Sequence, residues 1–160
     1  MPYIKKEERP QYDEIIRDLI FNLGENREGV DFVKQKLINL LSSQDLKSID
    51  GHFNYFITKT VKDLGWINGK SGTFFGTVGS PQYVELKDFI LDVIKQVYPP
   101  KYFNYNRAIG MLTCCSKEFS RRYKKKAVSA QMLLESLSNQ LYDEDVGPYE
   151  DTKIIENGDV

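Results

Sequence analysis

The chain has 160 residues and a formal net charge of −1, a length that fits one domain able to bury roughly two thirds of its unfolded surface. Charged residues make up 28% of the sequence and apolar residues 41%, which excludes a disordered chain and indicates a globular one. No apolar run approaches the ~20 residues of a membrane helix, and the first ten residues lack the apolar stretch of a secretory signal. We therefore expect a cytoplasmic protein without a membrane partner.

Two helices are predicted in the first part of the chain. Apolar side chains recur at intervals of three and four from Tyr12 to Leu23, and Gly24 can end this first helix. A second apolar stripe begins after Gly29 and stops at residue 42. Residues 42–50 are expected to form a loop or one short turn.

A third helix is predicted to begin at Asp50, whose carboxylate can accept hydrogen bonds from the first free amides, and to end at Gly65. Its buried stripe runs from Phe53 to Leu64. Five glycines alternate with apolar residues over the range 65–80, too many glycines for a helix and too apolar for a solvated linker. We expect a loop or short β-hairpin there, folded onto the core.

A fourth helix is predicted from Pro81 to the proline pair that begins at Pro99, because proline suits the first turn of a helix and breaks its interior. The fifth is expected to start at Asn104 or Asn106 and to reach about Lys125. It buries the stripe Ala108, Ile109, Leu112, Cys115, Phe119 and Tyr123.

A sixth helix is predicted from Val128 to Tyr142, with Leu133, Leu134, Leu137 and Leu141 facing inward. No segment repeats at a fixed period and none alternates strongly enough for a sheet. The expected fold is therefore mainly α: one domain over residues 1–160, built as a bundle of five to six helices. An ordered, extended tail, residues 148–160, is expected to follow the last helix.

The residue types that most often carry catalysis or metal binding are sparse. Cys114 and Cys115 are adjacent, so they cannot form an ordinary disulfide with each other, and we expect both to be buried thiols in a reducing compartment. His52 is the only histidine and is expected on a surface turn at the start of a helix. A zinc site needs three or four suitable ligands, so we expect no metal site and no catalytic histidine.

Two further motifs are incomplete. The segment 68–71, Asn-Gly-Lys-Ser, resembles the end of a phosphate-binding loop, but Gly65 is one residue too close and a helix precedes it. The acidic groups at 143–145 and 150–151 could bind Mg²⁺ only with matching acids on a neighbouring helix, and the spacing supplies none. A solvated acidic tail is the simpler interpretation, and no cofactor is expected.

Charge is distributed unevenly along the chain. Residues 143–160 hold seven acidic residues and one basic residue, whereas 121–126 is Arg-Arg-Tyr-Lys-Lys-Lys. The basic run complements a helix C-terminus and could also contact nucleic-acid phosphates, so a weak nucleic-acid binder remains an alternative. With a net charge near zero, it is not the preferred interpretation.

Several motifs resemble one family. They are Met-Pro-Tyr-Ile at the start, Asn54 to Thr58 (Asn-Tyr-Phe-Ile-Thr), Ile109-Gly110 with Glu118 to Tyr123 (Glu-Phe-Ser-Arg-Arg-Tyr), and the closing Pro-Tyr-Glu-Asp-x-Lys-x-x-x-Asn-Gly-Asp-Val. The chain is similar to a small helical family of unknown function from bacteria and their phages, whose members begin and end in this way. The resemblance implies no activity, cofactor or catalytic residue. Relative to the usual member, residues 66–101 and 125–147 look like insertions.

The motifs also have a physical interpretation. Arg121 and Arg122 offer planar donors that match the carboxylates of Glu150 and Asp151. We expect the tail to fold back and to be clamped there. Tyr123 and Tyr149 would pack beside the clamp, together with Tyr55.

Two functions compete on the sequence alone. The preferred one is a non-enzymatic protein that binds a macromolecular partner, most simply another protein, in a bacterial or phage setting. The alternative is a binder of a small anionic, nucleotide-like ligand, or a phosphate-ester hydrolase. Its pocket would use the side chains of Asn54, Tyr55, Glu118, Arg121 and Arg122.

Overall fold

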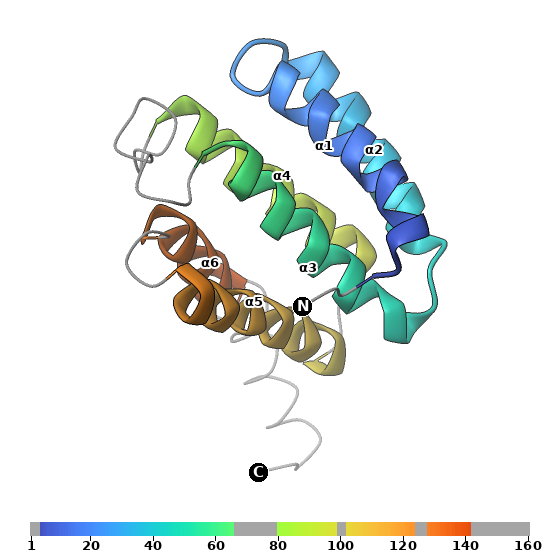
Figure 1. Cartoon of the computed structure of the whole chain (residues 1–160), viewed down its shortest axis with the longest axis vertical. Coiled ribbons are helices and arrows are strands. Elements are labelled where there is room, and N and C mark those ends of the chain that lie inside the picture. The colour runs from blue at the N-terminus through green and yellow to red at the C-terminus, as the bar shows by residue number, and fades with distance from the viewer. Residues whose placement is uncertain (1–3, 66–79, 99–101, 124–127, 142–160) are drawn as a thin grey trace, which may run out of the picture.

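Within the residues that the structure describes, the chain forms six α-helices and one short 3₁₀ turn (Figure 1). The computed structural model describes residues 4–65, 80–98, 102–123 and 128–141. No strand occurs within these segments, so the mainly helical fold is confirmed. The elements are η1 (Lys6–Glu8), α1 (Arg9–Asn22), α2 (Arg27–Ser42), α3 (Leu46–Asp63), α4 (Pro81–Val97), α5 (Tyr102–Tyr123) and α6 (Val128–Gln140).

The connection between α1 and α2 follows the expected chemistry. Leu23 donates its amide to the carbonyl of Leu19, and Gly24 then adopts a positive φ of 78°, a conformation that suits glycine at a helix end. The α2 helix begins at Arg27, three residues earlier than expected, because the side chain of Asn26 accepts the amide of Gly29 at 3.1 Å. Asn26 is thus the N-cap of this helix.

The start of α3 was predicted wrongly. The helix begins at Leu46, within the expected loop 42–50, and Asp50 lies in its second turn. Instead of capping the helix, the Asp50 carboxylate accepts the Tyr98 hydroxyl at 2.6 Å and a guanidinium nitrogen of Arg107 at 2.8 Å. A residue type that suits an N-cap was therefore recruited by partners on α4 and α5.

The remaining helices agree with expectation more closely. Ser80 caps α4 by accepting the amide of Tyr83 at 3.2 Å, and Pro81 occupies the first helical position. Helix α5 begins slightly earlier than expected and ends at Tyr123, and α6 ends at Gln140. Of the two cysteines, Cys115 is buried and Cys114 is exposed, so the prediction that both are buried was wrong for Cys114.

The helices stack as three layers of two (Figure 1). The outer layers are α1 with α2 and α5 with α6, and the middle layer is α3 with α4. Helix α1 packs on α3, which packs on α5, while α2 packs on α4, which packs on α6. The middle layer is covered on both sides, which explains why nine residues of α4 are buried.

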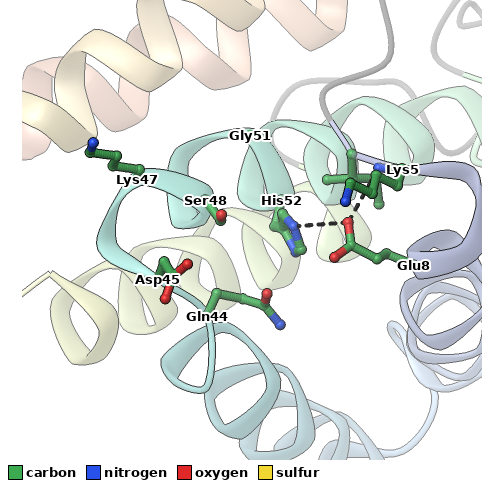
Figure 2. A pocket seen from close by; sticks show the side chains of 9 residues that line it. Lys5, Glu8, Gln44, Asp45, Lys47, Ser48, Gly51 and His52 are labelled. Atoms are coloured by element: carbon green, nitrogen blue, oxygen red, sulfur yellow. Dashed lines mark hydrogen bonds and ion pairs between the residues drawn. The ribbon is translucent and has the colours of Figure 1, made fainter.

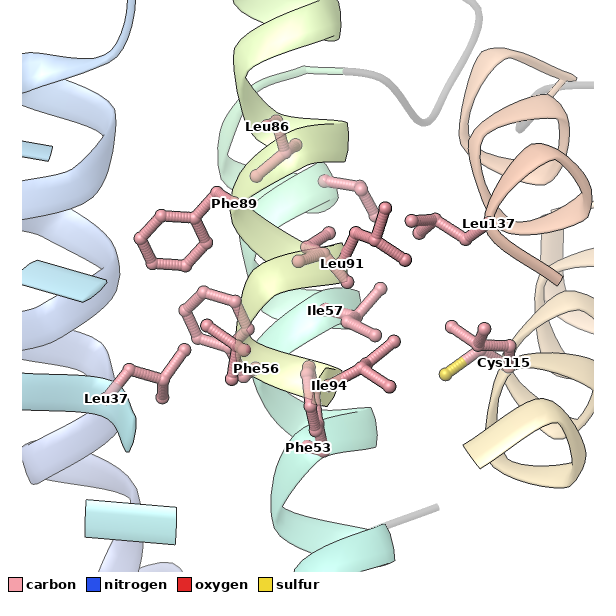
Figure 3. Packing of buried hydrophobic residues seen from close by; sticks show 14 of the residues in the cluster. Leu37, Phe53, Phe56, Ile57, Leu86, Phe89, Leu91, Ile94, Cys115 and Leu137 are labelled. Carbon is pink, nitrogen blue, oxygen red and sulfur yellow. The ribbon is translucent and has the colours of Figure 1, made fainter. Parts of the chain in front are cut away.

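Aromatic and branched side chains fill the space between the layers (Figure 3). The rings of Phe56 and Phe89 stack with centroids 6.0 Å apart and join α3 to α4, and Phe53 stacks on Tyr98 at 6.3 Å. Leu37 reaches them from α2, and Leu137 and Cys115 approach from α6 and α5. One continuous core therefore spans all three layers.

None of the helices in the described segments combines the length and the hydropathy of a membrane span. The predicted loop or hairpin at 65–80 lies almost wholly outside the described residues, and so does the predicted tail, 148–160. The segments predicted to be insertions, 66–101 and 125–147, contain helices α4 and α6. Whether shorter relatives lack these helices stays a prediction.

Candidate functional site

His52 is a buried residue with two polar neighbours, contrary to the expectation of a surface position. Its exposed fraction is 4%. The Tyr12 hydroxyl of α1 lies 2.8 Å from Nδ1, and the two rings meet edge to face. On the other side, Nε2 lies 3.5 Å from a carboxylate oxygen of Glu8 (Figure 2). His52 therefore joins α3 to both α1 and η1.

The neighbours favour one tautomer of the neutral ring. A carboxylate can only accept, so Nε2 carries the hydrogen that faces Glu8. Nδ1 is then an acceptor for the Tyr12 hydroxyl hydrogen. The same Glu8 oxygen also accepts the backbone amide of Lys5 at 3.2 Å. Neutral His52 thus uses both of its nitrogens, and Glu8 is held from two sides.

These groups border an open hollow of about 600 Å³ at the junction of η1, the α2–α3 connection and the first turns of α3 (Figure 2). Its wall is mainly polar, and the Asp45 carboxylate on it makes no cap bond to the start of α3. The lining residues are Ile4, Lys5, Glu8, Gln44, Asp45, Lys47, Ser48, Gly51 and His52. The volume suits a small polar molecule.

Burial controls the titration of the two rings. It lowers the pKa of His52 below the ordinary 6.5, and the negative charge of Glu8 opposes that shift only partly. Burial also raises the pKa of Tyr12 far above 10, with a further contribution from Glu8. At neutral pH both rings are therefore uncharged.

In the described part of the chain, no group of three or more histidine, cysteine or acidic side chains is arranged to hold a metal ion. Glu8 and His52 together supply too few ligands for zinc. The site is therefore a polar hollow with a buried hydrogen-bonded histidine at its edge.

The predicted ligand-binding residues on α3 point to different neighbours. Asn54 is buried and accepts the Thr58 hydroxyl at 3.2 Å. Tyr55 donates its hydroxyl to Asp13 of α1, and the guanidinium of Arg9 lies over its ring at 5.7 Å. Burial and the bond to Asp13 raise the pKa of Tyr55, so it stays protonated.

The three predicted residues on α5 lie further along the bundle. Two contacts show that α3 and α5 run in parallel. Asp50 pairs with Arg107, and eight residues further along each helix Thr58 lies by Cys115. This register places Glu118 about two helical turns beyond Asn54. Glu118 pairs with Arg121 at 2.9 Å, which lowers the pKa of Glu118. A single pocket lined by the predicted residues of α3 and those of α5 together stays a prediction.

The predicted tail clamp is only half described. Tyr123 packs on Phe119 at 6.2 Å, and the guanidinium of Arg122 lies 5.7 Å from the Tyr123 ring. Tyr149, Glu150 and Asp151 lie outside the described residues. The clamp therefore stays a prediction too.

Sequence reasoning missed Glu8 and Tyr12 as partners of His52. Tyr12 was assigned to the core from its spacing alone, and Glu8 precedes the first apolar stripe. The available signal was the hydroxyl of a core tyrosine, since a buried hydroxyl needs a partner.

A sequence model described as "Domain of unknown function (DUF6899)" matches residues 1–160. The chain belongs to this family. The expected membership of an uncharacterised helical family is thereby confirmed, and the DUF6899 description names no activity. No curated protein and no solved structure matches the chain.

Proposed function

We propose that this DUF6899 chain is a non-enzymatic cytoplasmic protein that acts by binding another protein, and that the outer face of α1 and α2 is the contact surface. The observation that carries the proposal is the exposure of two large aromatic side chains. Phe21 is 83% exposed and Phe32 is 65% exposed. The setting we propose is a bacterial cytoplasm, or a host cytoplasm for a phage-encoded copy.

Helix geometry places both rings on the same side of the outer layer. Phe21 follows the buried Leu19 by two residues, and Phe32 follows the buried Val30 by two residues. Two residues correspond to about 200° around a helix, so each phenylalanine points away from the core. Both also lie near the Gly24 turn, where α1 and α2 are joined. Both rings therefore lie toward the same end of this face.

The partner expected from this chemistry presents apolar side chains between polar ones. Exposed aromatic rings act as anchors at protein interfaces, whereas nothing in the folding of α1 or α2 requires them. The ammonium group of Lys36 lies 4.7 Å from the centre of the Phe32 ring. A pair of rings with a cationic neighbour offers a small anchor, which suits a reversible contact rather than a permanent complex.

A site-specific photo-crosslinker placed at position 21 or 32 tests the proposal in cells, with position 84 as the matched control. Val84 is also an exposed apolar residue, at 47%, but it lies on α4. We expect one protein to be captured at positions 21 and 32 and not at 84. The purified partner should then bind Phe21→Ser/Phe32→Ser at least tenfold more weakly than wild type, the loss of a typical anchor. Equal affinity for both forms, or no adduct specific to 21 and 32, would rule the surface out.

A second candidate, small-ligand binding, is supported by the hollow beside His52. Its volume and the uncommitted Asp45 carboxylate fit a polar ligand. A thermal-shift series with nucleotides, phosphate and small amines tests it, because a ligand of the folded state raises the midpoint. The rise should disappear in Ser48→Trp, which fills the hollow. A series without any rise would dismiss this candidate.

A further inference from the structure

The polar hollow between η1 and the start of α3 holds two carboxylates that come from different elements. Glu8 belongs to η1 and Asp45 directly precedes α3, and both line the hollow. Figure 2 shows them on opposite sides, with Gln44, Ser48 and His52 between them. One metal ion or one ammonium group would contact only one of the two. The carboxylates are therefore separate attachment points.

Each carboxylate keeps capacity for a further donor. One oxygen of Glu8 accepts the Lys5 amide at 3.2 Å and lies 3.5 Å from the His52 ring, whereas its other oxygen makes no hydrogen bond within the described residues. The Asp45 side chain neither caps α3 nor forms an ion pair in that part of the chain. A carboxylate offers about four acceptor positions, so both groups can still bind donors.

The basic residues around the hollow leave both carboxylates without a cationic partner. His52 is neutral at pH 7, because burial lowers its pKa. Lys5 and Lys47 also line the hollow, but both are exposed, and neither pairs with Glu8 or Asp45 among the described residues. Figure 2 shows the Lys47 amine turned away from the other lining side chains. An ammonium group of a ligand would therefore displace no existing ion pair.

We propose that the hollow binds a diamine, an aliphatic chain with an ammonium group at each end, one on Glu8 and one on Asp45. This inference rests on the second function proposed above, the hollow as a small-ligand site. A volume of about 600 Å³ accommodates such a molecule, and Ile4 in the lining offers an apolar contact to its methylene groups. Hydrogen bonds from ammonium to carboxylate are charge-assisted and shorter and stronger than neutral ones.

Isothermal titration calorimetry of the full chain tests the proposal with diaminoalkanes of increasing length, from 1,2-diaminoethane to 1,6-diaminohexane, and with butylamine. About 0.15 M salt screens non-specific attraction. We expect the diamine whose length matches the site to bind at least tenfold more tightly than butylamine, because it engages two carboxylates instead of one. Diamines that bind no more tightly than butylamine would overturn the proposal.

Three variants separate the two contacts from general electrostatics. Glu8→Gln and Asp45→Asn should each remove the advantage of the diamine over butylamine, since each leaves one carboxylate. Glu7→Gln is the matched control, because Glu7 is exposed on the same η1 turn but does not line the hollow. It should bind the diamine as wild type does, and a loss equal to that of Glu8→Gln would refute the site. Circular dichroism would confirm that each variant is folded.

The assignment to diamines and the hollow itself fail in different ways. Binding of butanoate or phosphate without binding of diamines, abolished by Ser48→Trp, would keep the hollow as a ligand site but overturn the diamine. No measurable binding of any of these probes would overturn both. Neither result bears on the surface at Phe21 and Phe32, which the crosslinking experiment tests separately.

Discussion

At the scale of single residues, polar side chains such as Asp50 and His52 connect different helices of the bundle. Asp50 is the clearest case, because one carboxylate accepts from Tyr98 at the end of α4 and from Arg107 near the start of α5. Burial and the bond to Asp50 raise the pKa of Tyr98, so it remains a donor. Asp50 therefore fastens one end of the middle layer to α5.

Replacing Asp50 by alanine should lower the free energy of unfolding by about 1–3 kcal/mol, because it leaves the buried Tyr98 hydroxyl without its acceptor. Asp63→Ala is the control: Asp63 pairs with Lys59 within α3, a partly exposed pair, and should cost less than about 1 kcal/mol. Urea denaturation at pH 7 measures both. Equal losses for the two variants would contradict the proposed role of Asp50.

At the scale of elements, the helix starts show which local signals were reliable. Pro81 marked the start of α4 correctly, and the structure adds a cap bond from the side chain of Ser80. For α3 the sequence offers two aspartates in a similar polar setting, Asp45 and Asp50, and the wrong one was chosen as the cap. Local pattern alone cannot separate them, because Asp50 is withdrawn from capping by residues 48 and 57 positions away.

The cap bonds predict the order in which three substitutions destabilise the protein. Ser80→Ala and Asn26→Ala should each destabilise the protein by about 1 kcal/mol, since each removes an accepted amide hydrogen bond. Asp45→Ala should cost less than either, because Asp45 occupies the N-cap position of α3 without a side-chain cap bond. Thermal unfolding in 0.2 M salt, which screens the helix dipole, measures the three variants. A loss for Asp45→Ala as large as that for Ser80→Ala would be inconsistent with the structure.

At the scale of the whole molecule, the three-layer stack makes the middle layer the main source of stability. Phe56 and Phe89 are almost completely buried, on the side of α3 and α4 that faces the α1–α2 layer (Figure 3). By contrast, Phe32 is 65% exposed and is not a member of the core cluster. The buried phenylalanines stabilise the fold, whereas the exposed one belongs to the proposed binding surface.

Phe56→Ala should therefore cost about 3–5 kcal/mol, the usual effect of removing a buried aromatic ring. Phe32→Ala should change the unfolding free energy by less than about 0.5 kcal/mol, as expected at an exposed site. Chemical denaturation of both variants provides the measurement. A large loss in Phe32→Ala would mean that this ring supports the fold and would weaken its assignment to a binding surface.

The sequence by itself determined a bundle of five to six helices and their inward faces, because apolar side chains repeat with the period of a helix and that signal is local. Its motifs also indicated the family. It also located the Gly24 turn and the start of α4 at Pro81. Only the tertiary structure decided which polar residues meet. His52 and Tyr12 are 40 positions apart, and Asp50 and Arg107 are 57 apart. A hydrogen bond between helices depends on how the layers stack, and no spacing along the chain records that arrangement.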